Sequence, residues 1–333
     1  MSTSEHGDLA PSGVADAGLA GWLTDVRRAG PAANRVLGVH RLRAAARQRD
    51  ESRPRGPQLP MVRNLVVGDL PARLYRPAPA PRPLVIYLHG GGFVLGSLTS
   101  HDATCRQLAR TADVAVLALD YRLAPEHPGP AAVDDATVAF ASATAHLAML
   151  GGDPESGVGL AGDSAGGALA VLAAVRLRDT GTPAASLLLA YPNADMTLSE
   201  PSVTREGHGW GLEADDLRWF VEQWIPDPAR RADPAVSPVH ADLSGLPPAV
   251  LATAGHDPLH DEGEALARLI TAGGADVRYR PHPGLVHGFL GLGTVSPAAA
   301  EATGRLFGDY GELVRGPGAA SSGQRPAEPP AIS

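Results

Sequence analysis

The sequence lacks several residue types, and each absence limits what the protein can do. Cys105 is the only cysteine among 333 residues, which excludes an internal disulfide and any zinc site built from several cysteines. There is no lysine: all 28 basic residues are arginine, against 36 acidic residues, and the formal net charge is −8. Binding to nucleic acid requires a clustered basic surface, so we expect no nucleic-acid partner.

Long hydrophobic runs are also missing. The longest apolar stretches, such as residues 168–175, fall far short of the roughly 20 residues that a membrane-spanning helix needs. Glu5, Asp8 and Asp16 interrupt the first twenty residues, which lack the apolar core of a secretory signal. Together with the scarcity of cysteine, this favours a cytoplasmic protein without a membrane span.

The composition is that of a globular protein, with 44% hydrophobic and 19% charged residues. Residues 1–17 and 316–333 are rich in Gly, Pro, Ser and Ala without periodicity, and we expect both to be mobile tails. Between residues 18 and 55, apolar residues at helical spacing predict two short helices, separated by Gly30 and Pro31. The remaining residues, 56–315, are expected to form the core domain.

Short apolar runs along this core predict a sheet of eight strands. Residues 65–67 and 72–75 are expected to form a hairpin around Gly68 and Asp69. The run 83–88 is apolar on both faces, as in a parallel sheet that helices cover on both sides. Further runs occur at 114–119, 158–161, 186–190, 249–252 and 277–279, and helical patterns separate them. This alternation predicts an α/β fold with a mostly parallel sheet and helices on both faces.

One connection is much longer than the others in this alternation of strands and helices. More than fifty residues separate Tyr191 from the strand at Ala249, and they include a helical segment that contains Trp219, Phe220 and Trp224. An insertion of this length between core elements is usually a lid or a binding element. We expect the N-terminal helices to cover its apolar face.

The motif Gly162-Asp163-Ser164-Ala165-Gly166 directly follows a predicted strand and opens a predicted helix. In a G-x-S-x-G elbow the glycines permit a sharp turn that exposes the serine hydroxyl, and the helix N-terminus favours negative charge nearby. The pattern is short, and its alternative interpretation is a glycine-rich connection with an inert serine. Nucleotide binding is disfavoured, because neither G-x-G-x-x-G nor Gly-Lys-Ser/Thr occurs at this turn.

A second motif, His89-Gly90-Gly91-Gly92, follows the strand predicted at 83–88. An H-G-G-G loop supplies backbone N–H groups that bind the oxyanion of an acyl-transfer reaction, and the N–H of the residue after the nucleophile, Ala165, supplies another. The alternative interpretation is a flexible turn beside a structural histidine.

The base is sought after the nucleophile, because this fold orders the chain as nucleophile, acid, histidine. His287 is favoured, since it lies in a loop after the last predicted strand and can reach the carboxyl edge of the sheet. His282 is the main alternative, while His256 and His260 lie too close to the acid. A metal site at His256 and His260 is disfavoured, because Pro258 interrupts any helix between them.

Three carboxylates compete for the role of acid. Asp257 lies at the end of a predicted strand and is favoured, whereas Asp261 fits the first turn of the next helix, and Glu262 follows it. Cys105 falls in a predicted helix and is expected to be a small buried residue, not a nucleophile.

Together these motifs resemble the hormone-sensitive-lipase-like family of α/β-hydrolase carboxylesterases. The matching segments run in the family's order and span roughly residues 60 to 310: His89 to Phe93, Asp120 to Glu126, Gly162 to Gly167, Asp257 to Gly263, and His287 to Phe289. The resemblance implies an α/β-hydrolase fold with an eight-stranded, mostly parallel sheet. It also implies a helical cap formed by residues 18–55 and 194–226, and a structural role for Asp120 to Glu126.

The resemblance assigns the functional residues as well. It implies a triad of Ser164, Asp257 and His287, and an oxyanion hole formed by the N–H groups of three residues, Gly91, Gly92 and Ala165. The expected activity is hydrolysis of short-to-medium acyl esters through an acyl-enzyme, with a small-molecule ester as partner and without cofactor or metal.

Other functions and assemblies stay open at this stage. The same triad would serve an amidase or a deacetylase of a small metabolite, because the nucleophile and oxyanion hole suit every acyl group. A non-catalytic small-molecule receptor on the same fold is another alternative, although such relatives tend to lose the base, and His287 is retained. A homodimer is compatible with the sequence.

Overall fold

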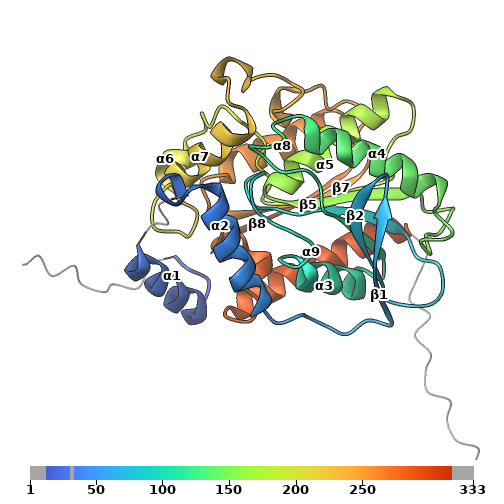
Figure 1. Cartoon of the computed structure of the whole chain (residues 1–333), viewed down its shortest axis with the longest axis horizontal. Coiled ribbons are helices and arrows are strands. Elements are labelled where there is room, and N and C mark those ends of the chain that lie inside the picture. Colours follow the sequence, from blue (N-terminus) through green and yellow to red (C-terminus); the bar gives the residue numbers. More distant parts are fainter. Residues whose placement is uncertain (1–12, 31–33, 317–333) are drawn as a thin grey trace, which may run out of the picture.

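A sheet of eight strands forms the centre of the computed structural model, which describes residues 13–30 and 34–316 (Figure 1). Its strands are β1 (Met61–Val67), β2 (Leu70–Arg76), β3 (Leu84–Leu88), β4 (Ala115–Leu119), β5 (Val158–Asp163), β6 (Leu187–Ala190), β7 (Ala249–His256) and β8 (Val277–Val286). Their order across the sheet is β1-β2-β4-β3-β5-β6-β7-β8. Only the pairs β1–β2 and β2–β4 are antiparallel, so the predicted mostly parallel α/β sheet is confirmed.

The strands that the sequence identified most clearly are those buried on both faces. All residues of β3, β4 and β5 are buried, as their continuous apolar runs predicted. The hairpin around Gly68 and Asp69 is also present. The strand β8 is longer than the predicted 277–279, because it lies at the edge of the sheet and its polar residues, such as Arg280 and His282, hide the strand pattern.

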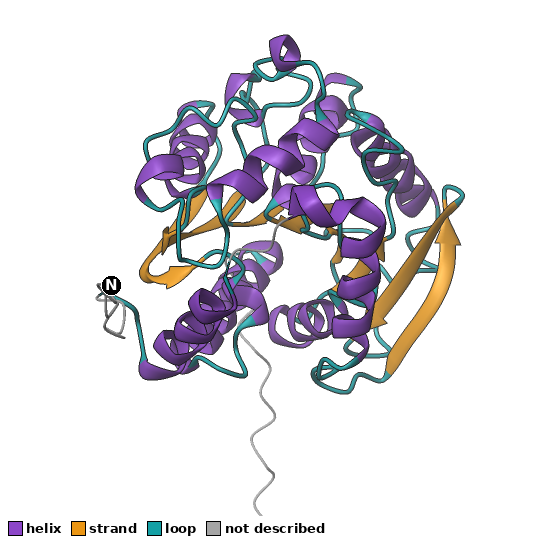
Figure 2. Ribbon diagram, turned by 60° about the vertical axis from the view of Figure 1, so that its left-hand side comes forward, coloured by secondary structure: helices purple, strands orange, loops and turns teal. Residues whose placement is uncertain are grey.

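Helices cover both faces of the sheet (Figure 2). On one face α3 (Asp102–Ala112) packs against α9 (Pro297–Arg315). On the other lie α4 (Ala131–Ala145), α5 (Ala165–Asp179) and α8 (His260–Ala272). The helices of each face pack against one of two apolar clusters, α3 and α9 against one and α4, α5 and α8 against the other. The carboxyl ends of the parallel strands are therefore the part of the sheet where a site can form.

The N-terminal segment contains the two predicted helices, α1 (Ala17–Ala29) and α2 (Asn34–Glu51), the second kinked at Gly38. The predicted tails 1–17 and 316–333 fall mostly outside the described residues. The end of the first tail is an exception. Asp16 caps α1 by accepting from the Leu19 N–H, and it also accepts hydrogen bonds from the Ser296 hydroxyl and the Ala298 N–H at the start of α9. Asp16 therefore connects the start of α1 to the start of α9.

The insertion between β6 and β7 contains α6 (Ser202–Arg205), α7 (Ala214–Trp224) and two short 3₁₀ turns, η1 (Pro228–Arg230) and η2 (Pro238–His240). The N-terminal helices do pack against it: α2 lies beside α7, where Arg35 pairs with Glu222 at 2.6 Å. They do not cover the whole apolar face, because Trp224 stacks on Phe93 of the loop after β3, with ring centroids 3.8 Å apart.

Among the described residues, no helix is both long enough and apolar enough to cross a membrane.

Candidate active site

Ser164 lies at the sharp turn between β5 and α5. Its backbone has φ 53° and ψ −123°, a conformation that costs energy for any residue with a side chain. Two hydrogen bonds hold it there: the Ser164 N–H donates to the Ala190 carbonyl at 2.9 Å, and its carbonyl accepts from the Asn193 N–H at 3.1 Å. The hydroxyl is thus raised above the end of the sheet, as the G-x-S-x-G motif predicted.

The glycines of this elbow are required by close packing. A Cβ atom on Gly162 would lie 2.2 Å from the carbonyl oxygen of Gly166, and one on Gly166 would lie 1.9 Å from the carbonyl oxygen of Leu88. Helix α5 can therefore begin directly against β3 and β5 only when both positions lack side chains.

Three side chains predicted from distant parts of the chain meet at this point. The His287 Nε2 atom lies 3.0 Å from the Ser164 Oγ, and its Nδ1 atom lies 2.8 Å from the Asp257 Oδ2. An ionised carboxylate only accepts, so the hydrogen-bond network assigns the proton to Nδ1 and leaves Nε2 to accept the serine proton. Asp257 is 1% exposed, and its Oδ1 accepts from the Leu259 N–H at 2.8 Å, which fixes the carboxylate.

The competing acids are bound elsewhere. Asp261 lies in the first turn of α8, as predicted, and its carboxylate pairs with Arg205 at 2.8 Å and accepts from the Ser202 N–H. It thereby ties α8 to α6. The competing histidine, His282, lies inside β8 and packs edge-on against Phe289, so it does not belong to a loop that could reach the serine.

The two histidines near the acid have partners of their own. His256 stacks on Trp210, with ring centroids 3.8 Å apart, and the Nδ1 atom of His260 lies 2.8 Å from the Ala254 carbonyl oxygen. Cys105 is fully buried in α3, and burial raises the pKa of its thiol well above the ordinary value. These contacts hold His256, His260 and Cys105 in places other than the Ser164 hydroxyl.

Residues 89–92, which we call the glycine loop, follow β3 and lie beside the elbow. Gly91 and Gly92 have φ values of 125° and 60°. Within the described part of the chain, no protein group accepts a hydrogen bond from the N–H of Gly91, Gly92 or Ala165. These three donors, all near Ser164 in the sequence or the sheet, are free to bind an oxygen atom of a ligand.

Phe220, which the sequence analysis placed in the insertion but assigned no contact, covers the glycine loop. A Cβ atom on Gly92 would lie 2.3 Å from the Cγ atom of Phe220, so the Phe220 ring of α7 packs directly against the glycine backbone. Phe220 is 9% exposed and also contacts Trp219 edge-on. Motif reasoning could not identify it, because the contact joins a core loop to an insertion without a recognisable pattern.

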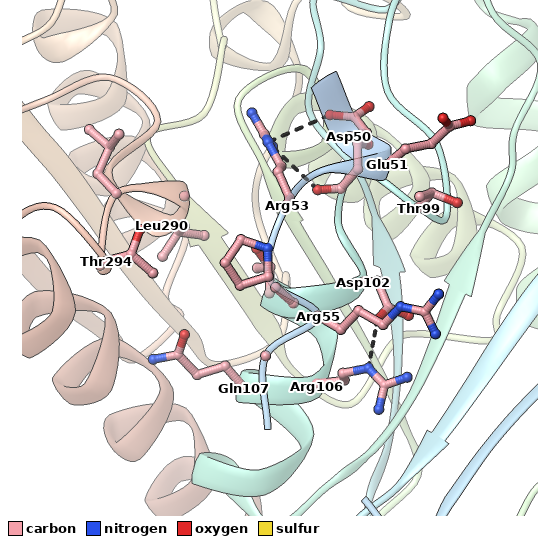
Figure 3. A pocket seen from close by; sticks show the side chains of 18 of the residues that line it. Asp50, Glu51, Arg53, Arg55, Thr99, Asp102, Arg106, Gln107, Leu290 and Thr294 are labelled. Carbon is pink, nitrogen blue, oxygen red and sulfur yellow. Dashed lines mark hydrogen bonds and ion pairs between the residues drawn. The ribbon is translucent and has the colours of Figure 1, made fainter. Parts of the chain in front are cut away.

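A cavity of about 1000 Å³ opens between the end of α2, the start of α3 and the segment that precedes α9 (Figure 3). Much of its lining is charged, and an ion pair between Arg106 and Asp102 forms part of its wall. Leu290 and Gly291, which follow His287 closely, also line it, but Ser164 and His287 themselves do not. The cavity therefore lies next to the site and does not contain the reacting groups.

Glu262 is a buried carboxyl group behind the site. Its Oε1 atom accepts from the Asn193 side chain at 2.9 Å and from the Ala194 N–H, while its Oε2 atom has no partner among the described residues. Burial raises the pKa of Glu262 well above the ordinary value, and the hydrogen bonds from Asn193, Ala194 and Asp195 only partly oppose this. Burial therefore favours the protonated form of this carboxyl group in the folded protein.

Glu262→Gln is expected to stabilise the protein at alkaline pH. An acid whose pKa is raised by folding contributes its full stability below its unfolded pKa, about 4.3, and loses it as the pH rises towards the folded value. Glutamine keeps the accepting oxygen and cannot ionise. The melting temperature of the variant should exceed that of the wild type by about 2–4 °C at pH 8, and the difference should vanish near pH 4. An equal difference at both pH values would contradict a pKa of Glu262 that folding raises.

The fold and the arrangement at its carboxyl edge are those of an α/β-hydrolase. A family model described as alpha/beta hydrolase fold matches residues 85–291. The chain belongs to this family, in the group of hormone-sensitive-lipase-like esterases that its motifs resembled, and it is an ester hydrolase.

Three similar proteins are named as ester-hydrolysing enzymes, two from bacteria and one from an archaeon. The carboxylic ester hydrolase LipN of Mycobacterium tuberculosis is 44% identical over 249 residues, which are 72% of this chain and 66% of LipN, so the chain matches slightly less than two thirds of that relative. An ethyl acetate hydrolase of Pseudomonas putida is 39% identical over 303 residues, 85% of this chain and 94% of the relative. The structure of a hyperthermophilic esterase from Pyrobaculum calidifontis is similar with a TM-score of 0.77 and 35% identity, covering 83% of this chain and 93% of that one.

Proposed function

We propose that the protein hydrolyses carboxylic esters with short-to-medium acyl chains through an acyl-enzyme intermediate on Ser164. The observation that carries the proposal is the relay of hydrogen bonds from the Ser164 hydroxyl through His287 to the buried Asp257. A serine hydroxyl becomes an effective nucleophile when an oriented imidazole accepts its proton.

The first half of the reaction transfers the acyl group to the enzyme. Ser164 Oγ attacks the ester carbonyl carbon as His287 Nε2 takes its proton, and Asp257 stabilises the imidazolium that results. The carbonyl oxygen becomes an oxyanion and accepts hydrogen bonds from the N–H groups of Gly91, Gly92 and Ala165, which donate to no other group of the described chain. His287 then protonates the alcohol oxygen, and the alcohol departs.

The second half returns the enzyme to its starting state. Water attacks the acyl carbon while His287 removes a proton from it, and collapse of the second tetrahedral intermediate releases the carboxylic acid and the Ser164 hydroxyl. The carbonyl needs no polarisation beyond that of the backbone donors, so each step is accounted for by residues of this chain.

The cap is proposed to set the length of the acyl chain. We assign residues 18–55 and 194–226 to it, and its helix α7 places Phe220 against Gly92, where the acyl carbonyl would bind. A bulky ring at this place favours small acyl groups. The name of the Pseudomonas putida relative, an ethyl acetate hydrolase, points the same way.

A panel of p-nitrophenyl esters from acetate to dodecanoate, compared with aryl amides, tests the substrate class. We expect kcat/KM to be highest for the acetate-to-hexanoate range and lower by at least about 100-fold for the amides. In Phe220→Ala the optimum should move to a longer chain, because a pocket contact is worth about 1–3 kcal/mol per methylene group. A wild-type enzyme that prefers amides would contradict the proposed ester preference. A Phe220→Ala variant with an unchanged chain-length profile would contradict the proposed role of Phe220 in limiting the acyl chain.

A further inference from the structure

Asp163, the residue that precedes the nucleophile, has a carboxylate that the proposed reaction does not use. The residue is 7% exposed, and its Oδ1 atom accepts from the Tyr87 hydroxyl at 2.6 Å and from the Gly90 N–H at 3.0 Å. The second contact joins the nucleophile elbow to the glycine loop, from which two of the three free N–H groups project. One carboxylate therefore connects the two halves of the site.

A buried carboxylate beside a developing oxyanion would weaken catalysis unless its charge were balanced. His101 is the basic side chain that faces this carboxylate: its Nε2 atom lies 3.3 Å from Asp163 Oδ1 and 3.4 Å from Oδ2. Burial disfavours the ionised carboxylate, but His101 and the hydrogen bonds from Tyr87 and Gly90 outweigh it and lower the pKa of Asp163 to about 2. The carboxylate is therefore ionised at neutral pH.

Two contacts orient the His101 ring. Its Nδ1 atom lies 2.8 Å from the Ser100 Oγ. That hydroxyl also accepts from the Ser97 N–H at 2.8 Å, and its oxygen lies 2.9 Å from the Ser97 carbonyl oxygen. Because the ionised Asp163 carboxylate only accepts hydrogen bonds, the His101 Nε2 atom that faces it is the donor of this contact.

The neighbouring His89 ring differs from His101 in its contacts. His89 stacks on His101 with centroids 5.5 Å apart, and its Nε2 atom has no partner within the described ranges. Burial and the neighbouring His101 lower the pKa of His89 to about 3, so His89 is neutral. Only His101 of this pair faces the carboxylate.

We propose that Asp163 and His101 are positioning residues for the ester hydrolysis proposed above, and that their buried ion pair holds the glycine loop in register with Ser164. The carboxylate fixes the Gly90 N–H, and His101 cancels the negative charge that would otherwise oppose the oxyanion. The inference rests on the proposed function, and it makes the residue between Gly162 and Ser164 part of the machinery that orients the oxyanion donors.

Fixing the Gly90 N–H and balancing the negative charge predict different results for three variants. Asp163→Ala removes the acceptor for Gly90 and is expected to lower kcat by about 100-fold or more, as loss of an oxyanion donor does, while KM stays within about threefold. Asp163→Asn keeps an accepting oxygen and should retain at least about a tenth of kcat. His101→Gln keeps a donor but leaves the anion unbalanced, and kcat should fall by at least about 10-fold.

The double variant Asp163→Asn/His101→Gln is the decisive measurement. It removes both charges and keeps two hydrogen bonds, the one from the Gly90 N–H to position 163 and the one between positions 163 and 101. Its kcat should therefore return to within about threefold of Asp163→Asn alone. Such non-additivity is the mark of a coupled pair. The inhibition constant of an aliphatic trifluoromethyl ketone, whose bound oxygen occupies the oxyanion position, should change in parallel with kcat/KM. Melting temperatures should show the same coupling without any substrate.

Tyr310→Phe is the matched control, because it removes a buried hydrogen bond, between the Tyr310 hydroxyl and Ser186 Oγ, that lies outside the site. It should lower the melting temperature and leave kcat unchanged. Independent effects of the two substitutions on kcat, or a folded Asp163→Ala variant with kcat within threefold of wild type, would overturn the inference. Absence of Ser164-dependent hydrolysis in the wild type would instead overturn the proposed function.

Discussion

Ser164→Ala is expected to lower the turnover of p-nitrophenyl butyrate by about 10⁶-fold, to the small rate that binding and backbone donors alone supply. The reason is geometric: among residues 13–30 and 34–316, the group within 3.0 Å of His287 Nε2 that can lose a proton and attack carbon is the Ser164 hydroxyl. Alanine fits the same backbone site, since Ser164 is held by main-chain hydrogen bonds, so the variant should fold. Steady-state assays measure the loss of turnover, and the melting temperature shows whether the variant is folded.

Ser186→Ala is the control for this prediction. Ser186 is also a buried serine next to a strand of the sheet, but its hydroxyl contacts Tyr310 and not the site. It should keep wild-type turnover and react with a fluorophosphonate probe, as the wild type does, with the label at Ser164. Ser164→Ala should not be labelled. Turnover above about 1% of the wild-type rate in Ser164→Ala would remove Ser164 from the role of nucleophile.

The fold could be predicted from the sequence wherever burial gives an unambiguous pattern. Strands β3, β4 and β5 are covered on both faces, so their sequences are largely short apolar runs, as is typical of strands inside a parallel sheet. At the edge of the sheet this signal disappears: β8 alternates arginine with apolar residues, because one of its sides has no partner strand among the described residues and part of it faces solvent. Edge strands are therefore harder to predict from a sequence than central strands.

Within the candidate site, the sequence could predict the residues whose placement depends on local backbone shape. The elbow around Ser164 and the turn at Gly91 and Gly92 need glycines at fixed spacing, and such spacing is visible in a sequence. The contact of Phe220 with Gly92 and the pair of Asp163 with His101 depend on how distant segments meet. The motif contains Asp163, but only the structure shows which group its carboxylate binds.

Asp257→Asn is expected to lower kcat by about 10⁴-fold with little change in KM, through the proton position of His287. The Oδ1 atom of Asp257 accepts from the Leu259 N–H, so an asparagine will keep its oxygen there and turn its NH₂ group towards His287 Nδ1. A ring that accepts at Nδ1 carries its proton on Nε2, and a protonated Nε2 cannot take the proton of Ser164. Rates and KM for p-nitrophenyl butyrate across the pH range, with circular dichroism as a check of folding, measure this effect.

Asp261→Asn separates this mechanism from a general loss of charge near α8. Asp261 lies four residues further along the same segment, and its carboxylate pairs with Arg205 of α6, away from the imidazole. Its substitution should lower the melting temperature and leave kcat within about threefold of wild type, because a partly exposed ion pair contributes about 1 kcal/mol or less. If Asp261→Asn lost more turnover than Asp257→Asn, the acid that orients His287 would be Asp261, and the relay from Ser164 would have to run through a rearranged loop.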